Sequence, residues 1–183
     1  SYLEVNGEGH REVKYYNLPT PSPITCGKQT ALLEENIKEN LLESLSYRLI
    51  SDVPMGVLLS GGLDSSSLVS LLSSIGEKNI KTFSVGFGAQ SDELEYAKIV
   101  ADKFKTQHTE ILIEAEDIKK YLPKIVLSLD EPLADTGAFA SWLIFKHIRE
   151  KTNIKVALVG EGADEIFAGY SWHCILDFLS WLP

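Results

Sequence analysis

Short apolar runs alternate with longer segments of helical period along most of the chain. From about residue 30 to 50, apolar positions recur at helical spacing, which predicts a long amphipathic helix with one buried face. That face is formed by Leu33, Ile37, Leu41, Leu45 and Leu49. Ser51-Asp52-Val53-Pro54 ends the helix, since a proline disfavours the α conformation in the residue before it. The apolar run at residues 57–59 then predicts a buried strand.

The same alternation continues toward the other end of the chain. Further strands are predicted at residues 80–87, 108–113 and 154–159, and further helices at 115–128 and 137–151. One more helix is capped by Ser91-Asp92-Glu93 and buries Ala97 and Ala101, and Pro123 is expected to interrupt or restart the helix around it. Strands alternating with helices predict an α/β fold, a doubly wound and mostly parallel sheet covered on both faces.

The first 23 residues follow a different pattern. Residues 2–16 predict a hairpin around Asn6-Gly7, and residues 18–23 an extended, proline-rich linker. A lone hairpin is marginally stable in water, so these strands are expected to belong to the sheet of a preceding domain. The chain is therefore predicted to divide into residues 1–23, a terminal hairpin plus linker, and residues 24–183, the α/β part.

Composition and charge narrow the classes of function. The 183 residues include 17 basic and 26 acidic side chains, a formal charge of −9, so a large nucleic-acid footprint is not expected. No apolar run approaches the roughly 18 residues of a membrane span. Cys26 and Cys174 form no CxxC pair, and the four histidines lack metal-ligand spacing. These features favour a cytoplasmic protein without nucleic-acid or membrane partners.

A glycine-rich loop follows the first predicted strand of the α/β part. It reads Ser60-Gly61-Gly62-Leu63-Asp64-Ser65 and leads into an apolar-periodic helix. Glycines let backbone N–H groups crowd together, and the positive end of the helix adds to them, which predicts a site for a phosphate chain. Ser60 and Ser65 supply hydroxyls, and Asp64 a hard oxygen ligand for Mg²⁺. The alternative is a glycine turn before a serine-capped helix; the strand–loop–helix context favours the phosphate site.

A second loop of the same kind follows the last predicted strand and reads Gly160-Glu161-Gly162-Ala163-Asp164-Glu165. Ligands of doubly wound sheets bind outside the carboxyl ends of the strands, so Asp64 is expected to face Glu161 and Asp164 across one crevice. Two carboxylates with pyrophosphate oxygens would coordinate Mg²⁺, and a third would orient or deprotonate a nucleophile. Alternatively, Asp164 and Glu165 only stabilise a helix N-terminus; the first loop beside them favours the functional interpretation.

The loop at residues 129–136 carries Asp130, Glu131 and Asp135. These acids either contribute to the substrate crevice or form a solvated loop that caps the next helix. The sequence leaves both interpretations open.

The two motifs together resemble a known family. The first resembles the SGGxDS loop of the ATP pyrophosphatases, and with residues 160–165 and Gly169-Tyr170 the chain resembles the glutamine-dependent asparagine synthetase family over roughly residues 28–172. The resemblance implies the adenine-nucleotide alpha-hydrolase type of sheet, with ATP and Mg²⁺ as cofactors. It implies that a carboxylate, aspartate or another acid, is adenylated with release of pyrophosphate and then attacked by ammonia derived from glutamine. The resemblance further implies that residues 1–23 are the terminal hairpin of a preceding glutaminase domain plus a linker. Residues 24–183 would be the first half of an ATP-binding domain, truncated at its C-terminus.

The resemblance also implies roles for individual residues. The nucleotide-binding residues would be Leu58, Ser60, Gly61, Gly62, Leu63, Asp64, Ser65, Val85 and Gly160. Asp64 and Asp164 would hold the metal, and Glu161 would be catalytic. The family usually has serine at Val159 and glycine at Ala168. Val159 weakens the case for aspartate, because relatives that amidate other acids or close lactam rings share both loops.

Two expectations concern the C-terminal part of the chain. The family's catalytic lysine lies further downstream, and the last basic residue here is Lys155, so the chain is expected to be an incomplete fragment that does not turn over substrate alone. Residues 172–182 predict a helix apolar on most sides, through which the chain is expected to self-associate. The alternative from another functional class is a nucleotide-binding module without catalysis.

Overall fold

The computed structural model describes residues 1–7, 9–17, 30–88, 93–133, 135 and 137–180. The chain divides into two compact units, residues 1–40 and residues 41–183, which are described separately.

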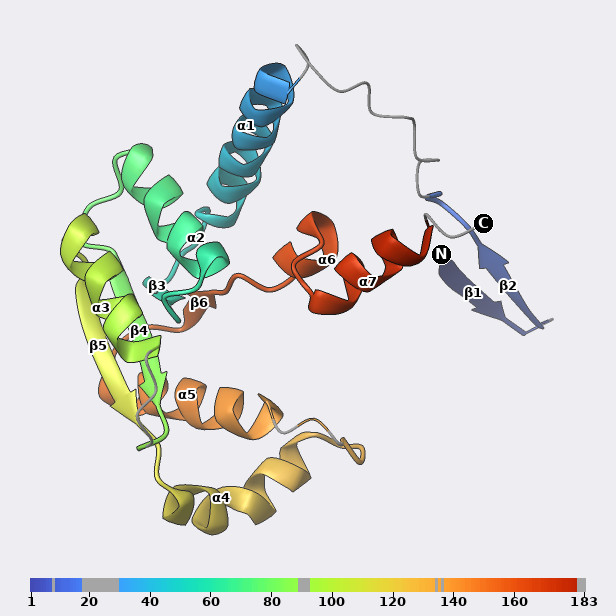
Figure 1. Cartoon of the computed structure of the whole chain (residues 1–183). Coiled ribbons are helices and arrows are strands. Elements are labelled where there is room, and N and C mark those ends of the chain that lie inside the picture. Colours follow the sequence, from blue (N-terminus) through green and yellow to red (C-terminus); the bar gives the residue numbers. More distant parts are fainter. Residues whose placement is uncertain (8, 18–29, 89–92, 134, 136, 181–183) are drawn as a thin grey trace. The chain divides into compact units, whose positions relative to one another are not determined.

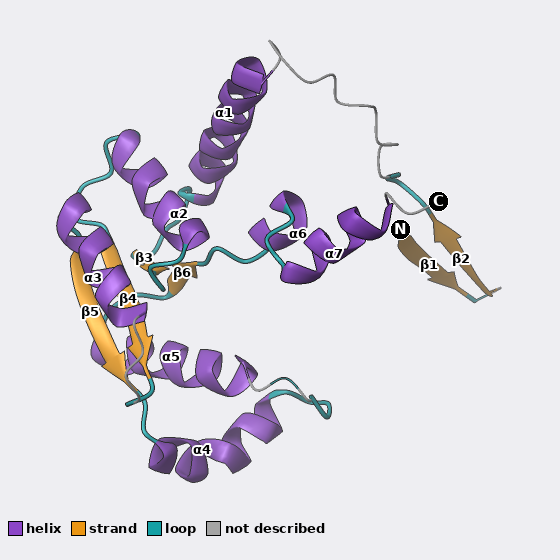
Figure 2. Ribbon diagram, viewed as in Figure 1, coloured by secondary structure: helices purple, strands orange, loops and turns teal. Residues whose placement is uncertain are grey.

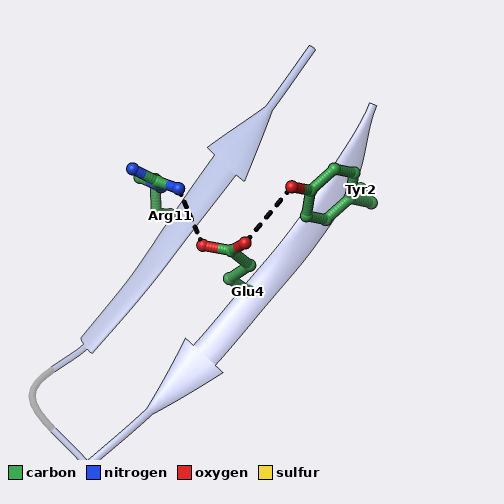
Figure 3. Close-up of polar contacts among 3 residues, drawn as sticks. All are labelled: Tyr2, Glu4 and Arg11. Atoms are coloured by element: carbon green, nitrogen blue, oxygen red, sulfur yellow. Dashed lines mark hydrogen bonds and ion pairs between the residues drawn. The ribbon is translucent and has the colours of Figure 1, made fainter. Parts of the chain in front are cut away.

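The first unit begins with a hairpin of β1 (Tyr2–Asn6) and β2 (Gly9–Val13), paired antiparallel with Glu4 opposite Arg11. Figure 3 shows that the Glu4 carboxylate accepts a hydrogen bond from the Arg11 guanidinium on the other strand at 2.9 Å, and one from the Tyr2 hydroxyl on its own strand at 3.2 Å. The predicted hairpin is confirmed. Its side chains are largely exposed on both faces, and its place in a larger sheet stays a prediction.

The second unit is built on a four-stranded parallel sheet in the order β5-β4-β3-β6 (Figures 1 and 2). The strands are β3 (Met55–Leu58), β4 (Lys81–Gly86), β5 (Gln107–Leu112) and β6 (Val156–Leu158). The α/β, doubly wound prediction is confirmed, with every described strand of this sheet parallel to its neighbours. The ends of each strand lie within two residues of the predicted ends, and β4 and β6 are shorter than predicted at both ends.

Seven helices are described along the chain (Figure 2). They are α1 (Thr30–Arg48), α2 (Leu63–Ser74), α3 (Glu93–Phe104), α4 (Ala115–Ser128), α5 (Gly137–Lys151), α6 (Ala163–Phe167) and α7 (Ser171–Ser180). None of these helices is long and apolar enough to cross a membrane.

Two apolar cores show how the helices cover the sheet. Buried Val57 and Leu59 pack in one core with residues of α2 and α3, whereas Leu58 between them packs in the other with residues of α4 and α5. Successive side chains of a strand point to opposite faces, so the central strand β3 contributes to both cores. This explains why residues 57–59 are apolar without alternation.

The strand order also determines where two loops meet. The chain runs from β3 outward through β4 to β5 and then returns to the other side of β3 with β6. The loops after β3 and β6 therefore leave the carboxyl ends of adjacent strands at the point where the strand order reverses. In doubly wound sheets this is the place where ligands bind.

Two local predictions were wrong. Within the second unit, the described part of α1 contributes buried Leu45 and half-buried Leu49 to the core, whereas Leu41 is 37% exposed. Only the last turns of α1 have described neighbours in the apolar core.

Pro123 lies inside a continuous α4 and does not interrupt it. A proline removes one helical hydrogen bond, but α4 stays regular because fully buried Ile125 and half-buried Ile118 anchor it in the core on both sides of Pro123.

Candidate active site

A cleft of about 270 Å³ opens at the reversal point of the sheet. It is lined by the two predicted loops together with the end of β3 and the segment after α6: Leu58, Ser60, Asp64, Ser65, Val159, Gly160, Glu161, Gly162, Asp164, Glu165 and Tyr170. Asp64 thus shares one cleft with Glu161 and Asp164, as expected. The chemical roles of these residues stay predictions.

The first loop leaves helix donors free at the cleft. Gly62 is the N-cap of α2, and no side chain caps this helix. Ser66 N–H donates to the Gly62 carbonyl at 3.0 Å, but within the described residues the N–H groups of Leu63, Asp64 and Ser65 have no protein acceptor. Free first-turn donors at the positive end of a helix favour an anionic ligand. No serine caps α2, and the phosphate-binding role of this loop stays a prediction.

The serine hydroxyls hold the loop in shape. The Ser60 and Ser65 hydroxyls lie 3.0 Å apart, and the Ser65 hydroxyl also accepts from the Ser60 N–H at 3.2 Å. The Ser60 hydroxyl accepts from the Gly62 N–H at 3.3 Å. Ser65 is buried and Ser60 exposed, so Ser60 is the hydroxyl that a ligand in the cleft can reach without rearrangement of the loop.

Gly61 is required by packing against a helix. Its φ is +83°, and a Cβ at this position would come within 2.5 Å of the Ala97 backbone nitrogen and 2.6 Å of the Tyr96 Cβ. Gly61 does not line the cleft. Only glycine allows this close approach of the loop to α3.

Gly160 brings the second loop against the first. A Cβ on Gly160 would lie 3.1 Å from the Asp64 Cβ and 3.3 Å from the Ser65 backbone nitrogen. The two loops therefore touch through backbone and short side chains, which leaves the space above them open. A side chain at position 160 would press against Asp64 and Ser65 of the first loop.

The acids of the cleft fit a hard cation only in part. Among the described residues, no three His, Cys, Asp or Glu side chains stand close enough together to hold a metal ion. Mg²⁺ usually takes one or two protein carboxylates and completes its octahedron with water and phosphate oxygens. Asp64 and Asp164, on opposite loops of the same cleft, fit that pattern as a donor pair.

Tyr170 and Glu165 form a hydrogen-bonded pair at the cleft. The Tyr170 hydroxyl donates to Glu165 Oε1 at 2.7 Å. This bond raises the pKa of Tyr170 to about 12, because deprotonation would put two anions in contact. The same bond lowers the pKa of the Glu165 carboxyl, which is stabilised in its ionised form.

Several predicted nucleotide-binding residues lie beside the cleft and not in its lining. They are Gly61, Gly62, Leu63 and Val85. Leu63 is 82% exposed at the first position of α2, and Val85 is half-buried near the carboxyl end of β4. Their assignment stays a prediction. Val159, Gly162, Glu165 and Tyr170 also line the cleft without having been predicted to bind. The sequence signals for them were their positions in or next to the second motif and, for Val159, the departure from the serine that is usual in the family.

The acidic loop before α5 caps that helix. The Asp135 carboxylate accepts from the Gly137 N–H at 2.8 Å. Asp130, Glu131 and Asp135 are absent from the lining of the cleft. The capping interpretation is therefore the one that the described residues support.

Comparisons with known proteins agree with the two motifs. The family model described as asparagine synthase matches residues 36–183. The chain is 39% identical over 172 residues to asparagine synthetase [glutamine-hydrolyzing] 1 of Bacillus subtilis, covering 93% of this chain and 26% of that protein. It is 35% identical over 147 residues to human asparagine synthetase [glutamine-hydrolyzing], covering 74% of this chain and 26% of that protein. The chain thus spans about a quarter of the length of these relatives.

A solved structure shares the fold. The glutamine-dependent NAD⁺ synthetase from Acinetobacter baumannii, determined in complex with ADP, superposes with a TM-score of 0.51 at 18% identity. The match covers 92% of this chain and 31% of that one. This likeness concerns the fold of the sheet and its helices.

Proposed function

The chain belongs to the asparagine synthase family, and we propose that its cleft is the ATP site of an amide-forming ligase. In the first step a substrate carboxylate oxygen attacks the α-phosphate of ATP, the bond to the β-phosphate breaks, and pyrophosphate leaves. In the second step ammonia attacks the activated carbonyl, and AMP leaves with the former carboxylate oxygen. The observation that carries this proposal is the convergence of free helix N–H groups and carboxylates from two loops in one cleft.

The first loop would bind the phosphates. The N–H groups of Leu63, Asp64 and Ser65 supply donors, and the exposed Ser60 hydroxyl supplies another. Leu58, Val85 and Gly160 are proposed to line the adenosine side. Gly160 has a structural reason to be glycine, because a side chain there would close the space between the two loops.

Asp64 and Asp164 are the proposed metal-holding residues. Their carboxylates are hard oxygen donors from opposite loops of the cleft. A bound Mg²⁺ would neutralise charge that develops on the departing pyrophosphate. The protein's part is to keep the two carboxylates apart, so that phosphate oxygens enter between them.

Glu161 is proposed to act on the nucleophile. It lines the cleft and is exposed, and within the described residues its carboxylate has no hydrogen-bond partner. A free carboxylate next to the activated carbonyl would orient the incoming amine and accept its proton, which typically contributes about 10²–10⁴-fold in rate.

The acid that is amidated is proposed to be aspartate, with ammonia derived from glutamine as the names of the relatives imply. The second candidate is amidation of a different carboxylate or closure of a lactam ring. Val159 favours this candidate, because its apolar side chain lines the cleft and is 40% exposed there. An apolar wall offers no hydrogen bond to a polar substrate group.

The first test is nucleotide binding by this chain. Calorimetric titration with ATP at a series of Mg²⁺ concentrations should show metal-dependent binding. Asp64→Asn and Asp164→Asn should raise the Mg²⁺ concentration needed by roughly tenfold, because Mg²⁺ prefers anionic oxygens. Glu161→Gln should leave this binding nearly unchanged, and Asp52→Asn, at an exposed turn away from the cleft, is the matched control.

The second test identifies the acid. Pyrophosphate release from ATP is measured with aspartate and a panel of other carboxylates, with ammonia as nucleophile, in a protein of the full length of the relatives. Release with aspartate alone supports asparagine formation, and release with another acid supports the second candidate.

The metal titrations of the first test also check the division of roles. If Asp64→Asn, Asp164→Asn and Glu161→Gln behave alike in them, the proposed division of roles is wrong.

A further inference from the structure

The cleft carries more carboxylates than a catalytic Mg²⁺ uses. Asp64, Glu161, Asp164 and Glu165 line it, and the described lining contains no lysine, arginine or histidine. A site that offers three or four carboxylates to one cation leaves few coordination positions for phosphate oxygens, whereas Mg²⁺ in phosphate-transfer sites keeps one or two. Yet no three of the described acids stand close enough to hold a metal ion.

One of the four acids is restrained by a neighbour. Within the described residues, Glu165 alone among them has a side-chain hydrogen bond, from the Tyr170 hydroxyl at 2.7 Å. A hydrogen bond to a charged acceptor is short and about twice as strong as a neutral one. It restrains the Glu165 carboxylate by holding its Oε1 atom against the Tyr170 hydroxyl.

The position of Tyr170 is itself determined by the turn after α6. Ala168 is left-handed at φ 58°, and the Gly169 N–H donates to the Asp164 carbonyl at 3.0 Å. A Cβ on Gly169 would run into Asp164 Oδ1, so the turn lies directly against that acid. The Tyr170 ring stacks on Trp172 with centroids 5.7 Å apart and planes at 14°. The turn and the stacking on Trp172 together place the Tyr170 hydroxyl next to Glu165.

We propose that Tyr170 is a positioning residue that holds Glu165 out of the coordination sphere of the metal, so that a cation bound by Asp64 and Asp164 keeps positions open for phosphate oxygens. The inference rests on the proposed function for the identity of the metal-holding pair. It assigns Tyr170 a role through Glu165 and not in contact with the reacting atoms.

The test measures metal binding without turnover. Mn²⁺ replaces Mg²⁺, and free Mn²⁺ is counted by electron paramagnetic resonance with the 183-residue chain, with and without ATP. Tyr170→Phe should bind Mn²⁺ alone on the order of tenfold more tightly, since a freed carboxylate adds an anionic ligand. ATP should then raise the Mn²⁺ affinity of this variant less than that of the wild type.

Two further variants separate this role from a merely structural one. Tyr47→Phe is the matched control, because the Tyr47 hydroxyl donates to Glu43 Oε1 at 3.1 Å on an exposed face of α1; it should bind like the wild type. Adding Glu165→Gln to Tyr170→Phe should return Mn²⁺ binding to the wild-type level. Circular dichroism checks that all variants are folded.

The outcomes are distinct. Weaker or unchanged Mn²⁺ binding by Tyr170→Phe, or a double variant that still binds tightly, would overturn the positioning role. If ATP does not raise the Mn²⁺ affinity of the wild type, that result counts against the proposed function. The positioning role of Tyr170 is still tested in that case, because it is judged from Mn²⁺ binding to the variants without ATP.

Discussion

At the scale of single residues, the turn after α6 holds a strained backbone. Ala168 has φ 58° and ψ 43°, a left-handed conformation that costs an L-residue with a Cβ about 1–2 kcal/mol. Glycine adopts it freely but loses more freedom on folding, by about 0.4–1 kcal/mol. Ala168→Gly should therefore raise the free energy of unfolding by about 0.5–1 kcal/mol, measured by urea denaturation.

Ala140→Gly is the control for this prediction. Ala140 lies inside α5, where glycine should lower the free energy of unfolding by about 1 kcal/mol. If both glycine variants are destabilised alike, the left-handed conformation of Ala168 is not a source of strain.

The two glycines of the first loop should respond differently to a side chain. Gly61→Val collides with the α3 backbone and should lower the free energy of unfolding by several kcal/mol, on the order of an overpacked core site or more. Gly62 has an extended backbone, and a Cβ added there would meet only the Ser60 hydroxyl, at 3.3 Å. Gly62→Val should keep the fold and lose ATP binding, because its side chain enters the space before the free N–H groups.

Thermal unfolding and calorimetric ATP titration of both variants check this pair. A folded Gly62→Val protein that binds ATP as the wild type does would contradict the phosphate-binding assignment. The contact with α3 that distinguishes Gly61 from Gly62 is not signalled by any local pattern in the sequence.

At the scale of elements, a half-buried histidine links two strands. His108 of β5 bonds the Thr82 hydroxyl through Nδ1 at 2.9 Å and the Ser84 hydroxyl through Nε2 at 3.1 Å, both on β4. Partial burial lowers the pKa of His108 below its ordinary value of 6.5; Glu110 and Asp102 oppose this shift and Lys98 adds to it. His108 thus gives a hydrogen-bond partner to the hydroxyls of Thr82 and Ser84, both of which are buried.

The sign of the pH effect follows from linkage. Because the folded pKa is lower than the unfolded one, the unfolded state takes up the proton first, and stability falls as pH drops below about 6.5 and through the folded pKa. His108→Gln should reduce the difference in urea midpoint between about pH 7.5 and about pH 5.5. His10→Gln, on the exposed hairpin, should leave it as in the wild type; an equal effect of both substitutions would refute the assignment.

At the scale of the whole molecule, α6 and α7 expose a large apolar surface. Among the described residues, the exposed apolar side chains of these helices are Ile166, Phe167, Trp172, Ile175, Leu176 and Leu179, each at least 50% exposed. Apolar surface of this kind favours association. The chain is therefore predicted to self-associate through residues 172–182, of which 181 and 182 lie outside the described residues.

Light scattering at several concentrations tests this prediction. Ile175→Lys with Leu179→Lys should lower the average mass toward that of one chain, 20.3 kDa. Leu127→Lys is the control, since Leu127 is 78% exposed on α4 and should leave association unchanged. A wild-type chain that is monomeric at all concentrations would rule the prediction out.

Local patterns were enough to predict the elements and both loops. Apolar periodicity and glycine position report on a few neighbouring residues, and such short-range constraints decide whether a segment is a strand, a helix or a tight turn. The parallel sheet, the two motifs after β3 and β6, and their meeting at one edge followed from the order of these elements. The hairpin at residues 2–13 was predictable for the same reason.

Contacts between distant segments were decided by tertiary structure alone. Gly61 packs against Ala97, Gly160 against Asp64, and Pro123 is tolerated because its helix is anchored in a core built from other elements. The bond between Tyr170 and Glu165 is another contact that tertiary structure decided. Close packing and hydrogen bonding depend on distances between chain segments that no local pattern specifies, so the sequence determined which groups are available and the fold determined which of them meet.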